Sequence, residues 1–157
     1  MVGKAKDLLF VDPGRLVDGE LELFLVATHP GNPRLGWVPW YEFAMCPVGC
    51  PERHMGAISL RVGHTPHILF YAGHIGYHVL LPYRGHHYAA RSCRLLFPLA
   101  RAHRLNPLWI TCDPDNWASR RSCELAGGTL VEIVDVPSAD PLYWQGSRQK
   151  CRYRFDL

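Results

Sequence analysis

The sequence predicts a mixed α/β fold in which helices lie across a β-sheet. Short apolar segments separated by turn residues fill the first half of the chain. In the second half, strand-like segments alternate with segments of helical periodicity. The 157 residues are 48% hydrophobic and 20% charged, which suits one domain that buries a core without disulfides or metal. We therefore expect a single domain over residues 1–157.

Four strands are expected in the first half, each bounded by turn-forming proline, glycine or asparagine. In the fourth strand, alternation places His74 and His78 on one face and Tyr77 on the other. The four predicted strands cover residues 21–28, 40–45, 54–62 and 73–81.

The second half begins with a helix predicted over residues 87–103. Pro98 lies inside it and costs about 3 kcal/mol unless the helix kinks there. Asn116 opens a second helix as a capping residue, and Gly127 follows its end. The other elements of this half are a strand at 108–112, that second helix at 117–125, and strands at 129–136 and 150–157.

Charge and hydropathy exclude several classes of protein. The formal charge is only +3, and acidic residues are interleaved with basic ones, so nucleic-acid binding is disfavoured. No apolar run approaches the roughly 20 residues of a membrane helix. Residues Met1–Asp7 lack the apolar stretch of a signal peptide, so we expect a cytoplasmic protein whose six cysteines are reduced.

The segment "LLPYRGHHYAAR", residues 80–91, carries an apolar strand through Pro82 into a basic turn and a helix. The first N–H groups of a helix have no partner, and the helix dipole adds positive charge, so the turn suits a phosphate. Arg84 supplies a further donor. An ordinary strand-to-helix turn explains the same residues equally well.

Asn116 and Ser119 open the second helix directly after its strand. Ordinary capping explains them when they are considered alone. Both helix openings, however, follow neighbouring strands, and ligands of open α/β sheets bind beyond the carboxyl ends of the strands. Together the two openings favour a long ligand with phosphates at one end and amides along its arm.

The segments "VLLPYRGHHYAA" and "LWITCDPDNWASRRSCELAGGTLVEI" together resemble the GNAT superfamily of N-acetyltransferases, in particular its branch of bacterial ribosomal-protein acetyltransferases. The turn of that family reads Q/R-x-x-G-x-G/A. Arg84 and Ala89 match its ends, whereas His87 stands at a glycine position. The resemblance implies a centrally splayed sheet and acetyl-CoA as co-substrate. The implied cofactor contacts are Val79, Leu80, Leu81, Arg84, Gly85, His86, His87, Tyr88, Ala89, Asn116 and Ser119.

The histidine at position 87 is compatible with this turn if its backbone has helical dihedral angles. Glycine is required only for positive φ or very close approach. We therefore expect His87 to keep the N–H donor and to add an imidazole beside the anion.

The family chemistry implies direct attack of an amine on the thioester, which needs a base, an oxyanion donor and an acid. A backbone N–H near Val79 or Leu80 is the implied oxyanion donor. His74 and His78 are the candidate bases because imidazole exchanges protons near neutral pH. A packed strand histidine is the alternative for each of them. Glu42 and His54 are lesser candidates for the same role.

The general acid has no assignment. The family commonly places a tyrosine in the second helix, at a position that corresponds to Cys123. Tyr88 and Ser119 are the substitutes. The acceptor, a small molecule or a peptide, is unidentified. The aromatic residues that either line its pocket or fill the core are Trp37, Trp40, Tyr41 and Phe43.

Four other hypotheses remain open. Cys46, Cys50 and His54, with His64 or His67, have a loose metal-site spacing, although no metal is our expectation. The domain could also bind acyl-CoA without catalysis, in a regulatory role, or bind no cofactor and serve as an interaction domain. An exposed terminal strand would permit a homodimer.

Overall fold

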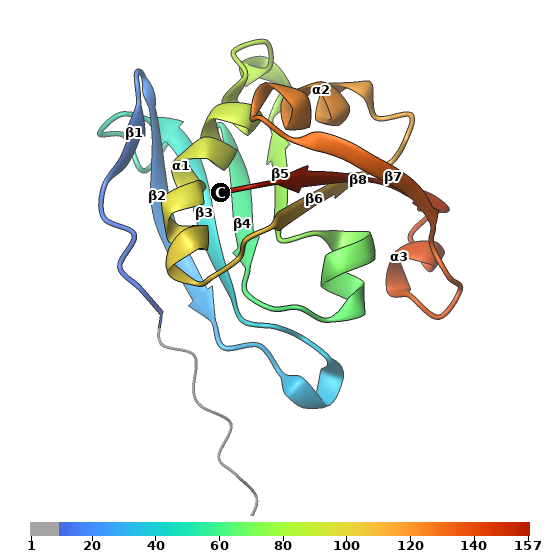
Figure 1. Cartoon of the computed structure of the whole chain (residues 1–157). Helices are drawn as coiled ribbons and strands as arrows, with labels where there is room; N and C mark the ends of the chain where they lie inside the picture. Colours follow the sequence, from blue (N-terminus) through green and yellow to red (C-terminus); the bar gives the residue numbers. More distant parts are fainter. Residues whose placement is uncertain (1–9) are drawn as a thin grey trace, which may run out of the picture.

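The computed structural model describes residues 10–157, so the leader-peptide prediction for Met1–Asp7 lies outside the described residues. Its larger sheet is antiparallel, with the strands in chain order from β1 to β5 (Figure 1). The hydrogen-bonded register continues across all five strands. These strands are β1 (Leu16–Asp18), β2 (Leu21–His29), β3 (Trp40–Pro47), β4 (Gly56–Arg61) and β5 (Ile75–Val79).

The smaller sheet has three antiparallel strands in the order β6–β8–β7. They are β6 (Leu108–Cys112), β7 (Thr129–Asp135) and β8 (Gln149–Phe155). The terminal strand β8 is therefore central and has a partner on both sides. The basis for our dimer prediction is wrong, because the exposed edge of this sheet is β7 and not the terminal strand.

Helix α1 (Tyr88–Ala102) crosses one face of the larger sheet (Figure 1). It continues past Pro98. Helix α2 (Trp117–Leu125) follows β6 and lies near the end of β5 (Figure 1). The sequence analysis missed β1, the short helix α3 (Pro141–Trp144), the 3-10 turns η1 (Pro33–Leu35) and η3 (Leu81–Tyr83), and the π-helical segment η2 (His67–Ala72).

Alternation along the central strands separates a core face from an open face. Tyr41, Phe43, Ile58 and Leu60 are at most 1% exposed and belong to the core cluster that includes α1 residues such as Leu96. The neighbouring positions on β3, β4 and β5 point to the opposite face. Residues on that face line two cavities.

The two sheets touch at one end of β5 and diverge along it. The N–H of His74 donates to the carbonyl of Trp109 at 2.7 Å, and the Trp109 N–H donates to His74 Nδ1 at 2.9 Å. Beyond this point β5 and β6 belong to separate sheets. The predicted mixed α/β fold is confirmed, and its strands splay apart between β5 and β6. Among residues 10–157 no helix is long and apolar enough to cross a membrane.

Candidate active site

The two helix openings singled out in the sequence line one cavity of about 530 Å³. We call this cavity the cofactor seat. It lies between the end of β5, the turn before α1, and α2. The residues that line it are Tyr77, His78, Val79, Tyr83, Arg84, Gly85, His87, Tyr88, Ala89, Asn116, Ala118, Ser119, Arg121, Ser122 and Leu125.

The turn before α1 leaves the N–H groups at the start of the helix without a side-chain cap. Gly85 has φ +97° and His87, the N-cap of α1, has φ 59° and ψ 29°. No side chain caps the helix, so the first N–H groups are available to an anion. Our expectation of ordinary helical dihedrals at His87 is wrong, because this residue adopts the left-handed conformation that favours glycine.

The charges around the cofactor seat favour an anion. The lining residues include Arg84, Arg121 and His87 and no carboxylate. Arg84 Nε donates to the carbonyl of Val79 at 2.9 Å, which holds the guanidinium beside the turn. An anionic ligand therefore meets positive groups and free N–H donors in one place.

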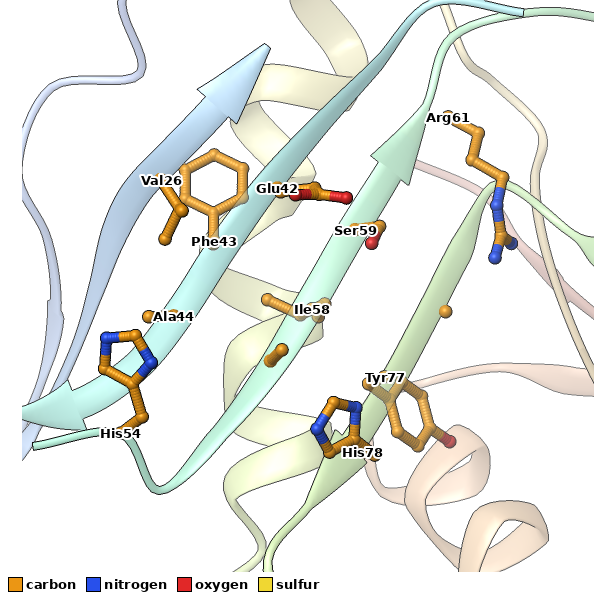
Figure 2. A pocket seen from close by; sticks show the side chains of 12 residues that line it. Val26, Glu42, Phe43, Ala44, His54, Ile58, Ser59, Arg61, Tyr77 and His78 are labelled. Atoms are coloured by element: carbon orange, nitrogen blue, oxygen red, sulfur yellow. The ribbon is translucent and has the colours of Figure 1, made fainter. Parts of the chain in front are cut away.

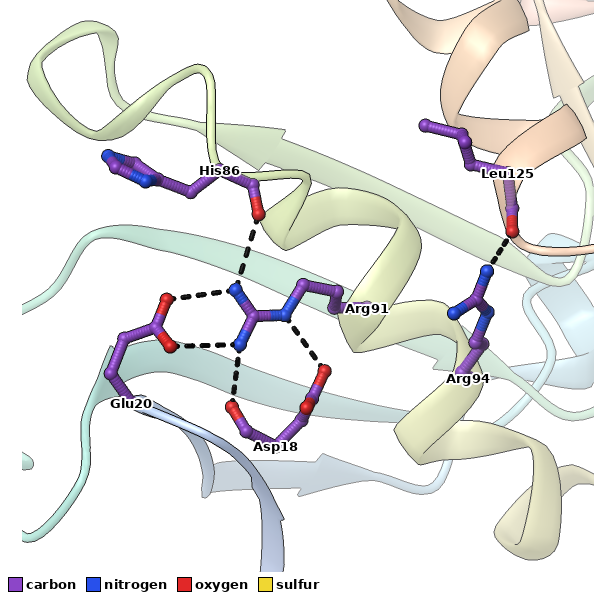
Figure 3. A network of polar contacts seen from close by, with 6 residues as sticks. All are labelled: Asp18, Glu20, His86, Arg91, Arg94 and Leu125. Atoms are coloured by element: carbon purple, nitrogen blue, oxygen red, sulfur yellow. Dashed lines mark hydrogen bonds and ion pairs between the residues drawn. The ribbon is translucent and has the colours of Figure 1, made fainter.

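Arg91 ties the start of α1 to the β1–β2 hairpin (Figure 3). Its guanidinium contacts Asp18 Oδ2 and Glu20 Oε1, each at 2.8 Å, and Nη1 also donates to the carbonyl of His86 at 3.3 Å. The Arg91 hydrogen bond lowers the pKa of Glu20 to about 2. This network fixes the turn from outside the seat.

Three predicted cofactor contacts do not line the seat: Leu80, Leu81 and His86. The Leu80 N–H donates to the carbonyl of Met55 at 2.9 Å, so it is not free to stabilise an oxyanion. The Leu81 side chain is 74% exposed. His86 instead stacks on Tyr88, with ring centroids 5.2 Å apart. Of the two predicted oxyanion donors, only Val79 remains.

A second cavity, of about 570 Å³, lies on the open face of β3, β4 and β5 (Figure 2). We call it the acceptor cavity. Its floor consists of the small residues Ala44, Ala57, Ser59 and Gly76, which pair across the strands. Tyr77 and His78 line both the acceptor cavity and the cofactor seat.

The two candidate histidines differ in their surroundings. His78 is exposed and lines both cavities. Figure 2 shows its imidazole beside Tyr77 on β5. His74 is fully buried, and its Nδ1 accepts the Trp109 N–H, so Nε2–H donates to the Gly63 carbonyl at 3.1 Å. Burial lowers the pKa of His74 to about 4. With both nitrogens bonded, His74 lacks access to a substrate, and the structure brings only His78 to the cavities.

Glu42 and His54 also line the acceptor cavity (Figure 2). Trp40 Nε1 donates to Glu42 at 3.2 Å, and His29 Nε2 lies 3.4 Å from its carboxylate. The Trp40 bond, followed by His29, lowers the pKa of Glu42. A carboxylate with a lowered pKa is a weak base, but it attracts a cationic amine.

The chain matches the family described as acetyltransferase (GNAT) domain over residues 20–129, which is more than half of its length. It belongs to the GNAT family. The sequence-based assignment, with acetyl-CoA as the co-substrate of such domains, is therefore confirmed. No curated protein matches the chain.

Solved structures of GNAT proteins share the fold. An acetyltransferase from Agrobacterium tumefaciens is 19% identical with a TM-score of 0.64, and the match covers 97% of this chain and 99% of that one. The microcin self-immunity acetyltransferase MccE, solved with acetyl-CoA and AMP, is 15% identical, covers 75% of this chain and has a TM-score of 0.55. RimL, a ribosomal-protein α-N-acetyltransferase solved with coenzyme A, is 16% identical, covers 75% and has a TM-score of 0.54. The chain spans 61% of MccE and 62% of RimL.

Cys123, at the position where GNAT proteins commonly have tyrosine, is 1% exposed. The adjacent Cys112 thiol and burial raise its pKa. Two hydroxyls lie beside it: Tyr77 Oη is 3.9 Å from Cys123 Sγ and 2.7 Å from Ser119 Oγ. Sequence reasoning missed Tyr77, because its hydroxyl reaches α2 from a different element. Burial, followed by the neighbouring Glu20, raises the pKa of Tyr88, the other substitute.

The aromatic residues divide between core and cavity. Tyr41 and Phe43 are at most 1% exposed. Trp37 is 57% exposed and, with Trp40, lines a further cavity of about 430 Å³ beside Glu42. Tyr41 is therefore core, Phe43 is buried although it lines the acceptor cavity, and Trp37 and Trp40 are available to a ligand.

The proposed metal ligands do not converge. Within residues 10–157 no three His, Cys, Asp or Glu side chains are grouped to hold an ion. Cys46 is buried and donates to the Pro51 carbonyl, whereas His54 faces the acceptor cavity. All six cysteines, which lie between residues 46 and 151, are free thiols.

Proposed function

We propose that this GNAT protein transfers the acetyl group of acetyl-CoA to a primary amine by direct attack. The observation that carries the proposal is the meeting of two unlike cavities at Tyr77 and His78. One has free N–H donors and no carboxylate among its lining residues, and it suits a pyrophosphate. The other contains Glu42 and suits an amine.

In this proposal the residues at the junction divide the catalytic roles among them. His78 takes the proton of the substrate ammonium, and the N–H of Val79 stabilises the tetrahedral oxyanion. The hydroxyl of Ser119, which lies 2.7 Å from that of Tyr77, stabilises the departing thiolate by a hydrogen bond, and the thiolate takes its proton from solvent. Burial raises the pKa of Tyr77, so its hydroxyl stays protonated.

Thermal unfolding with acetyl-CoA tests the cofactor half of the proposal. At a hundredfold excess over Kd, binding stabilises by about 2.7 kcal/mol, a shift of roughly 5–11 °C for a chain of this size. Arg84→Glu should abolish most of the shift because it places a negative charge at the seat. The exposed Arg34, which lines none of the described cavities, provides the control variant Arg34→Glu.

Release of the coenzyme A thiol in the presence of an amine panel tests the catalytic half. A thermal shift without turnover of any amine would favour the regulatory acyl-CoA-binding alternative. The absence of both would favour the interaction-domain alternative.

A further inference from the structure

Arg61 projects from β4 toward β5 on the open face of the sheet (Figure 2). Its side chain lines the acceptor cavity and two neighbouring cavities. Nη1 donates to the carbonyls of Ala72 and Gly73, each at 3.0 Å. These two bonds anchor the guanidinium at the cavity wall.

The charge of Arg61 has no counter-ion in the described part of the chain. Among residues 10–157 no carboxylate lies within ion-pair distance of it, and no protein acceptor takes a hydrogen bond from Nε or Nη2. Burial lowers the pKa of Arg61, without an opposing contribution from an acid. A guanidinium with free donors, partly removed from water, binds a carboxylate through paired hydrogen bonds.

Gly76 makes room for this guanidinium on the floor of the cavity. A Cβ at position 76 would lie 2.7 Å from Arg61 Nη2 and 3.3 Å from Cζ. Glycine therefore lets the guanidinium approach β5 more closely than a residue with a Cβ would. This close approach gives a physical reason for glycine in the middle of a strand, where it otherwise weakens the sheet.

Gly76 and His78 are two positions apart on β5, so the anion-binding group and the proposed base face one cavity about 7 Å apart along the strand. One acceptor molecule can therefore reach both groups. Glu42 pairs with Ser59 on the same floor, and its carboxylate favours the ammonium over the anion at that side.

We propose that the acceptor is an amine that also carries a carboxylate, an amino acid or a short acidic peptide, and that Arg61 binds this carboxylate over Gly76. This inference rests on the proposed acetyl transfer and names the class of its acceptor.

Two matched pairs of acceptors test the inference. Phenylalanine is compared with phenylalaninamide, and the amidated dipeptide Ala-Glu with amidated Ala-Gln. The first pair represents a free amino acid and the second an acidic peptide. In at least one pair, the kcat/KM of the wild-type protein should be about 10- to 100-fold higher for the carboxylate-bearing member, the range expected for a charge-assisted hydrogen bond.

Three variants assign this preference to the guanidinium. Arg61→Gln should remove it. Gly76→Ala, which displaces a flexible side-chain end and no backbone, should weaken it without unfolding the protein. Arg34→Gln, on the exposed turn η1, removes the same charge elsewhere and should preserve it.

Titration calorimetry of the coenzyme A-loaded protein with the same four compounds decides the inference independently of turnover. Tighter binding of a carboxylate-bearing compound, lost in Arg61→Gln, supports it. Equal binding within both pairs, or no binding at all, overturns it. If wild-type protein acetylates neutral and acidic amines equally, the proposed function stands and only the acceptor class is wrong. If no thermal shift with acetyl-CoA occurs, the proposed function itself fails.

Discussion

His74, directly before β5, and His78, near the end of β5, share one face in the sequence pattern but have opposite environments. At the first end, His74 closes the contact between the two sheets through bonds to Trp109 and Gly63. At the other end, where β5 and β6 have separated, His78 is exposed between two cavities. The difference shows that the splayed strands leave one histidine accessible to a ligand, whereas the other is buried and bonded between the two sheets.

Replacement of His78, near the end of β5 where the strands have separated, should give the largest effect on activity. His78→Ala should lower the turnover of any accepted amine by about 100-fold or more, because a positioned base contributes 10²- to 10⁴-fold. The acetyl-CoA-induced thermal shift should be unchanged, since the seat keeps its backbone donors. Steady-state kinetics and thermal unfolding measure the two effects separately. Turnover within twofold of wild type would remove His78 from the chemistry.

Replacement of His74 tests the buried contact between the two sheets at the start of β5. His74→Ala leaves the Trp109 N–H and the Gly63 carbonyl without their partner, at a cost of about 2–4 kcal/mol in unfolding free energy. Folded His74→Ala protein should keep its activity per molecule. A loss of activity greater than the loss of folded protein would return His74 to the list of candidate bases. His74→Gln, which retains a hydrogen-bonding side chain, should lose less stability.

The pH dependence of stability tests the buried environment of His74. The pKa of His74 is near 4 in the folded protein and 6.5 for an unperturbed histidine, so between these values the unfolded chain binds more protons. The unfolding free energy should therefore fall as the pH decreases from 6.5 to 4, by at most about 3 kcal/mol from this group. Denaturant titrations over this range should give a flatter profile for His74→Ala than for wild type. Parallel profiles would contradict the assignment.

Most of the residues predicted as cofactor contacts line one cavity, whereas the acceptor cavity was predicted only in part, and the reason is physical. The seat lies between two helix openings, and local residues such as Gly85 and Asn116 specify those openings. The acceptor cavity depends on which residues of three strands pair: Gly76 opposite Ser59, and Arg61 reaching over from β4. Register and side-chain reach are long-range properties that alternation alone does not determine.

The strands and helices themselves followed from periodicity and turn residues. Strand β6 and helix α2 have the predicted boundaries. The missed elements are short segments with weak patterns, such as α3 (Pro141–Trp144). The separation of His74 from His78 could not be predicted, because the bond between His74 and Trp109 joins residues 35 positions apart.

A substitution in the turn between β5 and α1 should give the smallest effect. His87 holds φ 59°, a conformation that costs a side chain roughly 1–2 kcal/mol, whereas glycine costs about 0.5–1 kcal/mol in unfolded-state entropy. His87→Gly should therefore stabilise the protein by about 0.5–1 kcal/mol, or roughly 1–4 °C in Tm. His86 lacks a positive φ, so His86→Gly is the matched control and should not stabilise. If His87→Gly raises Tm but weakens acetyl-CoA binding, the imidazole at the seat contributes to binding and the strain is the cost of that contact. If affinity is unchanged, backbone N–H groups alone bind the anion at this turn. The acceptor cavity would then differ, because its proposed contacts come from side chains.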